Sequence, residues 1–104
     1  MSVDADDRVE VVDRPEQRRY ELLVGGEVAG FARYVRREPL ITFIHTVVEP
    51  AYGGRGLGQR LAQAVLDDAR ARGLRVRPSC PFIARYIREH PAEQDLVDPG
   101  SPSG

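Results

Sequence analysis

One stretch decides the fold, and it reads Val47-Val48-Glu49-Pro50-Ala51-Tyr52-Gly53-Gly54-Arg55-Gly56-Leu57-Gly58-Gln59-Arg60-Leu61. Four glycines lie within six residues, directly before a segment with helical periodicity. Glycine tolerates positive φ and lets backbone N–H groups approach an anion without side-chain interference. The N-terminus of a helix adds unpaired N–H donors and a partial positive charge. The stretch therefore predicts a strand, a loop suited to a diphosphate, and a helix.

Three alternative interpretations of the glycine-rich loop can be compared. A nucleotide P-loop is excluded because no Gly-Lys-Ser/Thr sequence follows. A Rossmann fingerprint should follow the first strand of a parallel sheet, whereas several antiparallel segments precede this loop. A turn without a ligand stays open as an alternative. If the loop does bind a diphosphate, Arg55 is expected to add a charge-assisted contact.

The residues before the loop follow the period of β-strands. Segments 9–12, 18–24 and 27–36 are strand candidates, and Gly25-Gly26 suits a tight hairpin between the second and the third. Residues 40–48 are rich in β-branched and aromatic residues. They are apolar on both faces, which predicts a central strand covered on both sides.

The residues after the loop change to the period of a helix. Apolar residues form one stripe at Leu61, Ala62, Val65, Leu66 and Ala69. Gly73 predicts the end of this helix, a short strand follows at 74–77, and a second helix begins at Pro81 and ends at Pro91. The order β-β-β-β-α-β-α predicts an α+β protein with a mixed sheet. A right-handed crossover makes its last two strands parallel.

Length and composition exclude several classes of protein. A chain of 104 residues forms one domain, and its net charge of -1 gives no electrostatic bias toward nucleic acid or acidic membranes. No apolar run approaches the roughly 20 residues of a membrane span, and the acidic start is unlike a secretory signal. The single Cys80 excludes an internal disulfide and favours a reducing compartment. We therefore expect a cytoplasmic protein with a disordered N-terminus at 1–8, a domain at 9–97 and a flexible tail at 98–104.

An antiparallel meander, this loop and an amphipathic helix together resemble the cofactor-binding motif of the GCN5-related N-acetyltransferases. In that family the loop amides bind the diphosphate of coenzyme A, and the pantetheine arm lies beside the preceding strand. The resemblance implies a minimal version of that fold, with a β-α-β-α cofactor-binding unit after the meander. It also implies that the strand at 40–48 diverges from its parallel neighbour near its end, so that N–H groups near Val47 and Val48 polarise the acetyl carbonyl. The implied site for acetyl-CoA or coenzyme A comprises Val47, Val48, Tyr52, Gly53, Gly54, Arg55, Gly56, Leu57 and Gly58.

Other stretches are similar to small single-domain members of the family, and the resemblance covers about residues 9–97. These stretches are His45-Thr46, Arg77-Pro78-Ser79-Cys80-Pro81-Phe82, His90-Pro91 and Asp95-Leu96-Val97. The chain departs from the family pattern in two ways. Gly53 stands where the pattern has Arg or Gln, and a short turn at 13–16 replaces the helices that help to form the acceptor pocket. The substrate side is therefore expected to be open, so that a bulky acceptor or a partner protein could complete it.

His45 is the best candidate for a general base. Its unperturbed pKa of about 6.5 suits proton transfer at neutral pH. By strand alternation it shares a face with Ile41, Phe43 and Val47. The alternatives are a histidine that is buried and hydrogen-bonded for packing, and Glu49 as the base or as an anchor for water.

Cys80 is the second catalytic candidate, because it directly precedes a helix whose field would lower a thiol pKa. In the small members, the matching cysteine and strand histidine have been considered a catalytic pair. Such a pair would transfer the acetyl group through an acyl-cysteine, with His45 assisting. Direct attack by the acceptor is the usual mechanism of the wider family. An inert, buried Cys80 is the alternative.

Two residues of the second helix have structural interpretations. Tyr86 lies where tyrosines of larger members can protonate the leaving thiolate, but its apolar stripe with Phe82, Ile83 and Ile87 favours a place in the core. His90 is expected to close the helix as a cation near its C-terminus. Two separated histidines and one cysteine make no metal site.

The sequence thus predicts an acetyl-CoA-dependent N-acetyltransferase for an unidentified amine or protein acceptor, as a monomer or weak homodimer. The alternative function is a non-catalytic module that binds coenzyme A or acetyl-CoA as a sensor or as a partner of another protein. A nucleic-acid-binding domain is disfavoured, because the arginines are dispersed among as many acids and the aromatic residues form no stacking motif.

Overall fold

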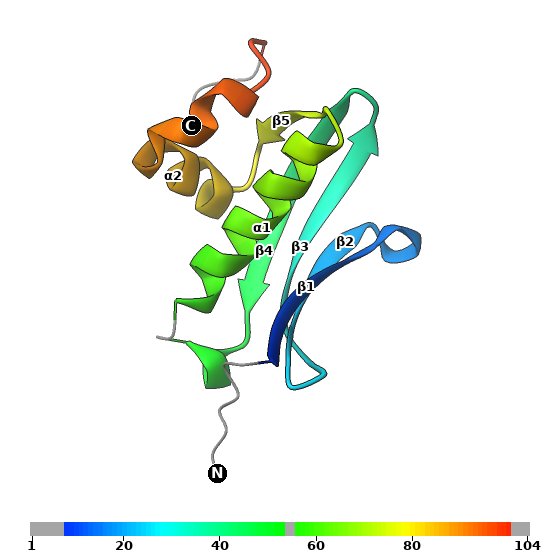
Figure 1. Cartoon of the computed structure of the whole chain (residues 1–104), viewed down its shortest axis with the longest axis vertical. Helices are drawn as coiled ribbons and strands as arrows, with labels where there is room; N and C mark the ends of the chain where they lie inside the picture. The colour runs from blue at the N-terminus through cyan, green and yellow to red at the C-terminus, as the bar shows by residue number, and fades with distance from the viewer. Residues whose placement is uncertain (1–7, 54–55, 101–104) are drawn as a thin grey trace.

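The computed structural model describes residues 8–53 and 56–100 (Figure 1). One sheet has the strand order β1 (Val9–Arg14), β2 (Arg19–Val24), β3 (Glu27–Arg37), β4 (Leu40–Val48) and β5 (Arg75–Pro78). Helix α1 (Leu57–Ala71) connects β4 to β5, and α2 (Pro81–Glu89) follows β5. Short 3-10 helices also lie in the described part of the chain, at η2 (Pro15–Gln17), η3 (Pro50–Tyr52) and η4 (Pro91–Leu96).

The connectivity confirms the predicted α+β order. The first four strands pair antiparallel with their neighbours, whereas β4 and β5 are parallel. Gly25 and Gly26 both have positive φ at the predicted hairpin, at 60° and 86°. The sequence predicts a flexible tail from residue 98. However, the Asp98 N–H donates to the Val76 carbonyl at 2.9 Å, so this residue is held against β5.

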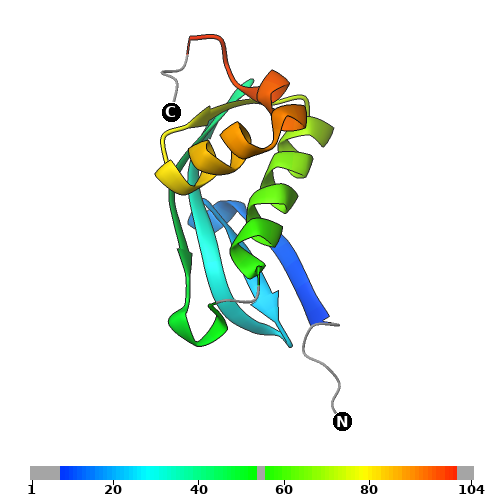
Figure 2. The same ribbon diagram turned by 90° about the vertical axis from the view of Figure 1, so that its left-hand side faces the viewer.

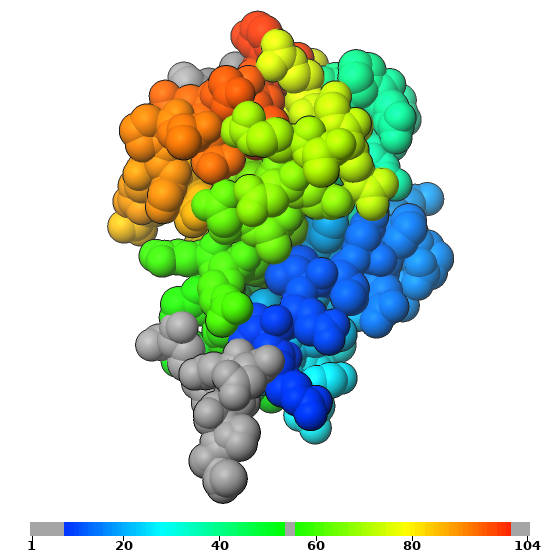
Figure 3. Space-filling view, viewed as in Figure 1, coloured from blue at the N-terminus to red at the C-terminus, as the bar shows by residue number. Residues whose placement is uncertain are grey.

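Both helices pack on the same face of the sheet and form one core with it (Figure 2). The predicted stripe of α1 is fully buried, as are Ile41 and Phe43 of β4. In the space-filling view, α1 lies between α2 and η4 on one side and β1 and β2 on the other (Figure 3). In the described part of the chain, no helix is long and apolar enough to cross a membrane.

The opposite side of the sheet, which we call the open face, carries Arg19, Glu21, Phe31, Arg33, Val35, Ile44 and His45. Val35 is 40% exposed and Ile44 is 43% exposed. The prediction that β4 is covered on both sides is therefore wrong. An apolar strand segment shows which residues can pack, but it does not show whether a second layer exists to cover them.

Glu21 is buried on the open face by two arginines. Its carboxylate accepts hydrogen bonds from Arg14 Nε at 3.2 Å and from Arg19 Nε at 2.9 Å. Phe31 lies under the Arg19 guanidinium, 4.9 Å from the ring centroid. The hydrogen bond from Arg19, more than that from Arg14, holds the pKa of Glu21 below its ordinary value of 4.5.

This ion cluster predicts a pH dependence of stability. Because the pKa of Glu21 is depressed in the folded protein, its contribution is present above the unfolded pKa and is lost as the pH falls through the folded pKa. Glu21→Gln should therefore lower the melting temperature at pH 7 and flatten its decline below about pH 4.5. Thermal unfolding of both proteins from pH 7 down to about pH 2.5 checks this. Parallel curves would show that Glu21 makes no such contribution.

Candidate functional site

Strands β4 and β5 pair over only the first half of β4. Their register runs from Leu40 opposite Arg75 to Phe43 opposite Pro78, and the Cys80 N–H donates to the Phe43 carbonyl at 2.9 Å. Beyond this point the chain after β5 enters α2, while β4 continues to Val48. The two segments therefore diverge between Phe43 and Val48, in a place where a parallel sheet would otherwise continue.

The backbone of β4 presents hydrogen-bonding groups to this divergence. The Glu49 N–H donates to the Ala29 carbonyl of β3 at 2.7 Å. Because backbone groups alternate sides along a strand, those of Val47 face β3 and those of Thr46 and Val48 face away from it. Buried or partly buried backbone groups need partners, and an extended ligand can supply them as an added strand would. Of the two residues named from the sequence, Val48 has the suitable orientation and Val47 does not. Thr46 is an addition.

The loop after β4 ends at a helix without a side-chain cap. Gly56 is the N-cap of α1, with φ 71° and ψ 14°, and no side chain among the described residues caps this end. A residue with a Cβ would be strained by roughly 1–2 kcal/mol in this conformation. Predicted site residues Gly54 and Arg55 lie outside the described residues. The glycine pattern predicts a diphosphate at this end, and the N–H groups and positive dipole of a first helical turn are partners that such an anion binds.

Gly58 in this first turn is in close contact with both walls of the divergence. A Cβ at Gly58 would lie 3.0 Å from Cζ of Phe82 and 3.6 Å from Cγ2 of Val48. Phe82 is on the first turn of α2 and is 38% exposed. Helix α1, helix α2 and strand β4 therefore converge at Gly58, directly beside the uncapped helix end.

His45 lies on the open face because of a β-bulge. Arg33 pairs with His45 and Tyr34 pairs with Phe43, which leaves Ile44 as an extra residue in β4. The bulge reverses the alternation, so the prediction that His45 shares a face with Ile41 and Phe43 is wrong. The exposed imidazole lies edge-on to Phe31, with 6.3 Å between ring centroids. The imidazole is therefore accessible from solvent on the open face and is not part of the core.

Cys80 lies on the other face of the sheet. The residue is 3% exposed, and its thiol donates to Thr46 Oγ1 at 3.3 Å. Thr46 follows His45 directly, so the two side chains point to opposite faces. The structure therefore does not bring His45 and Cys80 together as a pair. Glu49, the alternative base, is exposed just beyond the end of β4.

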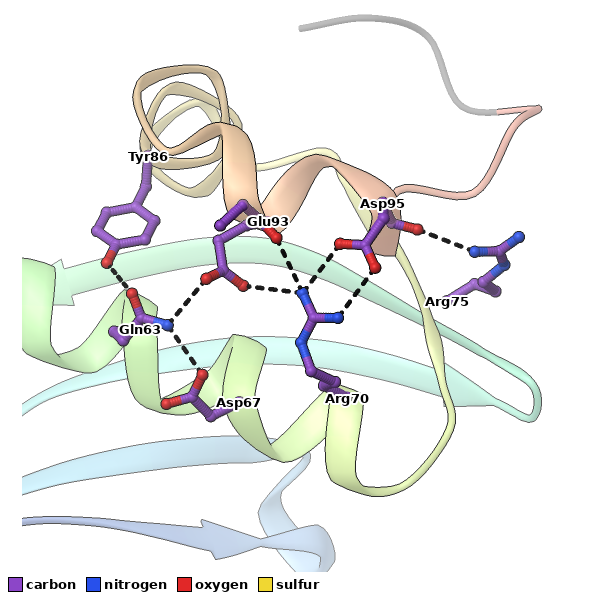
Figure 4. A network of polar contacts seen from close by, with 8 residues as sticks. Gln63, Asp67, Arg70, Arg75, Tyr86, Glu93 and Asp95 are labelled. Atoms are coloured by element: carbon purple, nitrogen blue, oxygen red, sulfur yellow. Dashed lines mark hydrogen bonds and ion pairs between the residues drawn. The ribbon is translucent and has the colours of Figure 1, made fainter.

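Tyr86 takes part in a polar network between the helices (Figure 4). Its hydroxyl donates to Gln63 Oε1 of α1, and Gln63 Nε2 donates to Asp67 at 2.8 Å and to Glu93 at 3.2 Å. Burial raises the pKa of Tyr86, and the nearby Glu93 and Asp67 raise it further. His90 caps α2, and its ring stacks on Tyr86 with 3.9 Å between centroids. The prediction that Tyr86 belongs to the core is confirmed.

The same network ties η4 to α1 on the side of the molecule away from the loop. Arg70 donates to both carboxylate oxygens of Asp95 at 2.9 Å, and Arg75 donates to the Asp95 carbonyl at 3.0 Å (Figure 4). The hydrogen bonds from Arg70 lower the pKa of Asp95. These contacts indicate a structural role for η4. The sequence alone gives no reason for this role, and Asp95-Leu96-Val97 is noted there only as a stretch similar to small family members.

Comparison with known proteins identifies the family. A family model described as GCN5-related N-acetyl-transferase matches residues 19–96. The chain belongs to the GCN5-related N-acetyltransferases. It shares its fold with a GCN5-like protein of Staphylococcus aureus, with a TM-score of 0.66 and 23% identity over 86% of this chain and 87% of that one. Acetyl-CoA is the acetyl donor in this family.

Several relatives are similar to this chain in sequence over part of their length. Human Protein NATD1 is 37% identical over 55% of this chain and 50% of its own. The N-alpha-acetyltransferase RimI of Mycobacterium tuberculosis is 46% identical over 44% of this chain and 32% of its own. An L-methionine sulfoximine/L-methionine sulfone acetyltransferase of Pseudomonas paraeruginosa is 37% identical over 71% of this chain and 48% of its own. The chain spans about half the length of the chicken and human NATD1 proteins that it matches.

For a GCN5-related N-acetyltransferase, Gly58 gives a direct test of the cofactor site. Alanine is a better helix former than glycine by about 1 kcal/mol, so Gly58→Ala should keep the fold stable. Its methyl group and the displaced Phe82 ring would occupy the approach to the helix end, so coenzyme A should bind about tenfold or more weakly. Isothermal titration calorimetry measures this, with Ala64→Gly on the same helix as a matched control. Unchanged affinity in Gly58→Ala would place the diphosphate elsewhere.

Proposed function

We propose that this chain binds acetyl-CoA along the divergence of β4 from β5 and transfers its acetyl group directly to an amine that approaches from the open face. The observation that carries the proposal is the register of β4. Its pairing with β5 ends at Phe43, while its backbone continues past Thr46 and Val48 to the uncapped N-terminus of α1. An extended arm and an anionic diphosphate would thus have adjacent partners on one continuous segment.

The chain's own residues would divide the work of binding. Backbone groups of Thr46 and Val48 would hold the pantetheine arm, and the first turn of α1 after Gly56 would hold the diphosphate. Gly54 and Arg55 are proposed as further partners from the sequence pattern. Phe82 and Gly58 would limit the width of the site.

Acetyl-CoA supplies the acetyl group as a thioester, so the C–S bond breaks as the N–C bond forms and the electron pair leaves on sulfur. His45 would accept the proton that the acceptor amine loses, because its imidazole is exposed on the side from which the acceptor comes. The N–H groups of Thr46 and Val48 are the donors available to polarise the carbonyl. Cys80 is buried and donates a hydrogen bond to Thr46, so it would hold β4 in position rather than carry the acetyl group.

The first experiment is thermal unfolding with acetyl-CoA, coenzyme A or ATP as a phosphate control. A ligand at about 100 times its dissociation constant adds roughly 2.7 kcal/mol, a shift of about 10 °C or more for a domain of this size. We expect such a shift with both coenzyme A species and little with ATP. No shift with acetyl-CoA would overturn the proposed cofactor site, and an equal shift with ATP would reduce it to a general phosphate site.

One observation favours a second candidate, a non-catalytic module that binds coenzyme A or acetyl-CoA. His45 and Cys80 lie on opposite faces, so the chain lacks the paired arrangement that an acyl-cysteine mechanism needs. A module of this kind would show the thermal shift but no release of free thiol from acetyl-CoA with any amine tested. Thiol release measured with a panel of amines therefore separates the two functions.

A further inference from the structure

A cavity opens on the open face beside the start of the divergence. Its volume is about 330 Å³, and we call it the η2 cavity after the short helix at its rim. Its lining residues are Glu16, Gln17, Arg18, Arg33, Tyr34, Val35 and Ile44. Ile44 is the bulged residue that directly precedes His45, so the cavity adjoins the proposed base. The volume lies at the low end of pockets for small organic molecules.

Two arginines, Arg18 and Arg33, line this cavity. Within residues 8–53 and 56–100, neither of them forms an ion pair or a side-chain hydrogen bond. Arg33 lies directly opposite His45 in the β3–β4 register. Guanidinium groups bind carboxylates through two parallel hydrogen bonds. Glu16 also lines the cavity, so two guanidinium groups face one carboxylate, and the net positive charge favours an anion on the side of the sheet that carries His45.

Arg18 is also held in a strained backbone conformation. With φ 57° and ψ 44°, it is the only non-glycine residue with positive φ among those described. Its carbonyl accepts the Tyr34 N–H at 2.9 Å. Glycine would adopt this conformation without strain. Strained residues gather at ligand sites, and here the strain falls on a cavity-lining arginine.

We infer that the η2 cavity binds a small amine acceptor with a carboxylate beside the amine, as in an amino acid. Arg18 and Arg33 hold the carboxylate, Val35 and Ile44 contact the side chain of the acceptor, and the amine lies toward His45. This inference rests on the proposed function and adds to it the class of the acceptor. The small volume favours a free amino acid over an acidic peptide.

The test is an NMR titration of the ¹⁵N-labelled protein, without acetyl-CoA, with L-leucine, L-methionine and L-glutamate. At least one should cause saturable shifts at the amides of Arg18, Arg33, Val35 and Ile44. For the amino acid that binds, the amine without its carboxylate (3-methylbutylamine in the case of leucine) should bind at least tenfold more weakly. If none of the three amino acids shifts these amide signals, the inference is overturned.

The variant Arg18→Gly separates recognition from structure. It removes both the guanidinium and the strain, so its melting temperature should stay equal or rise while amino acid binding weakens at least tenfold. Arg88→Gln, at an exposed arginine of α2, is the matched control and should bind as the parent does. Unchanged binding in Arg18→Gly would overturn the inference, as would an acidic pentapeptide that binds at these amides tenfold more tightly than any amino acid.

Failure of this inference can be distinguished from failure of the proposed function. A thermal shift with acetyl-CoA but no amino acid binding would overturn the acceptor class and leave the acetyltransferase proposal standing. Amino acid binding without any acetyl-CoA shift would overturn the acetyltransferase proposal instead.

Discussion

Replacement of His45 by glutamine is expected to lower kcat for acetyl transfer about 100-fold, because a positioned general base contributes roughly 10²- to 10⁴-fold. Glutamine keeps the size and polarity of the side chain but cannot take a proton. The imidazole is exposed on the open face, so the loss should appear in kcat with little change in melting temperature. Steady-state kinetics of the parent and of His45→Gln, together with thermal unfolding of both proteins, checks this.

Cys80→Ala is the control for that experiment. If the acceptor attacks the thioester directly, this variant should keep turnover within about tenfold of the parent, with a lower melting temperature from the lost packing. If the acetyl group passes through the thiol, Cys80→Ala should be inactive, and mass spectrometry of the parent with acetyl-CoA alone should show an acetylated cysteine. A His45→Gln variant with parental kcat would exclude His45 as the base and direct attention to Glu49.

Gly30→Ala is expected to have the largest effect on stability. A Cβ at Gly30 would lie 2.4 Å from the Val47 carbonyl oxygen and 3.1 Å from the Val48 Cα, both of them backbone atoms. Backbone atoms of a paired strand cannot rotate out of the way as a side chain can, so β3 and β4 must separate. We expect a loss of roughly 3 kcal/mol or more, comparable to the removal of a large core side chain.

Denaturant unfolding of Gly30→Ala measures this effect, with Gly26→Ala in the hairpin as the comparison. Gly26 has φ 86°, but a Cβ at this position would have no atom within 4 Å, so the variant loses only the backbone preference of glycine. Gly30→Ala should be clearly the less stable of the two. Because the displaced segment carries Val48, the variant should also bind coenzyme A more weakly in conditions where it stays folded. Equal stability of the two variants would refute the close approach of the strands.

The sequence predicts the order of elements because each element has a complete local signal. The glycine pair at 25–26, the stripe of α1 and the prolines around α2 depend on neighbouring residues only. The glycine loop is predicted for the same reason, since Gly56 takes the positive φ that glycine favours. The family resemblance adds the expectation that β4 and β5 diverge.

The bulge at Ile44 could not be predicted, because it depends on how β4 meets Arg33 and Tyr34 of a different strand. Strict alternation from Ile41 places His45 on the wrong face as a result. Thr46 was missed because its role comes from its backbone direction and from Cys80, far along the chain. Gly30 did carry a signal: a glycine inside a strand often marks a close approach of another backbone.

The bulge also has a consequence for how members of this group diverge from one another. It makes β4 a partition, with Thr46 toward the core and the proposed cofactor site, and His45 and Ile44 toward solvent. Substitutions on the solvent side leave the core intact, so under the proposed function acceptor preference can change by single substitutions without loss of folding. Substitutions on the core side of β4 change the packing of the core and the proposed binding of acetyl-CoA together, so we expect both properties to constrain them. Descendants of one such scaffold are thus expected to keep a common acetyl donor while their acceptors differ widely.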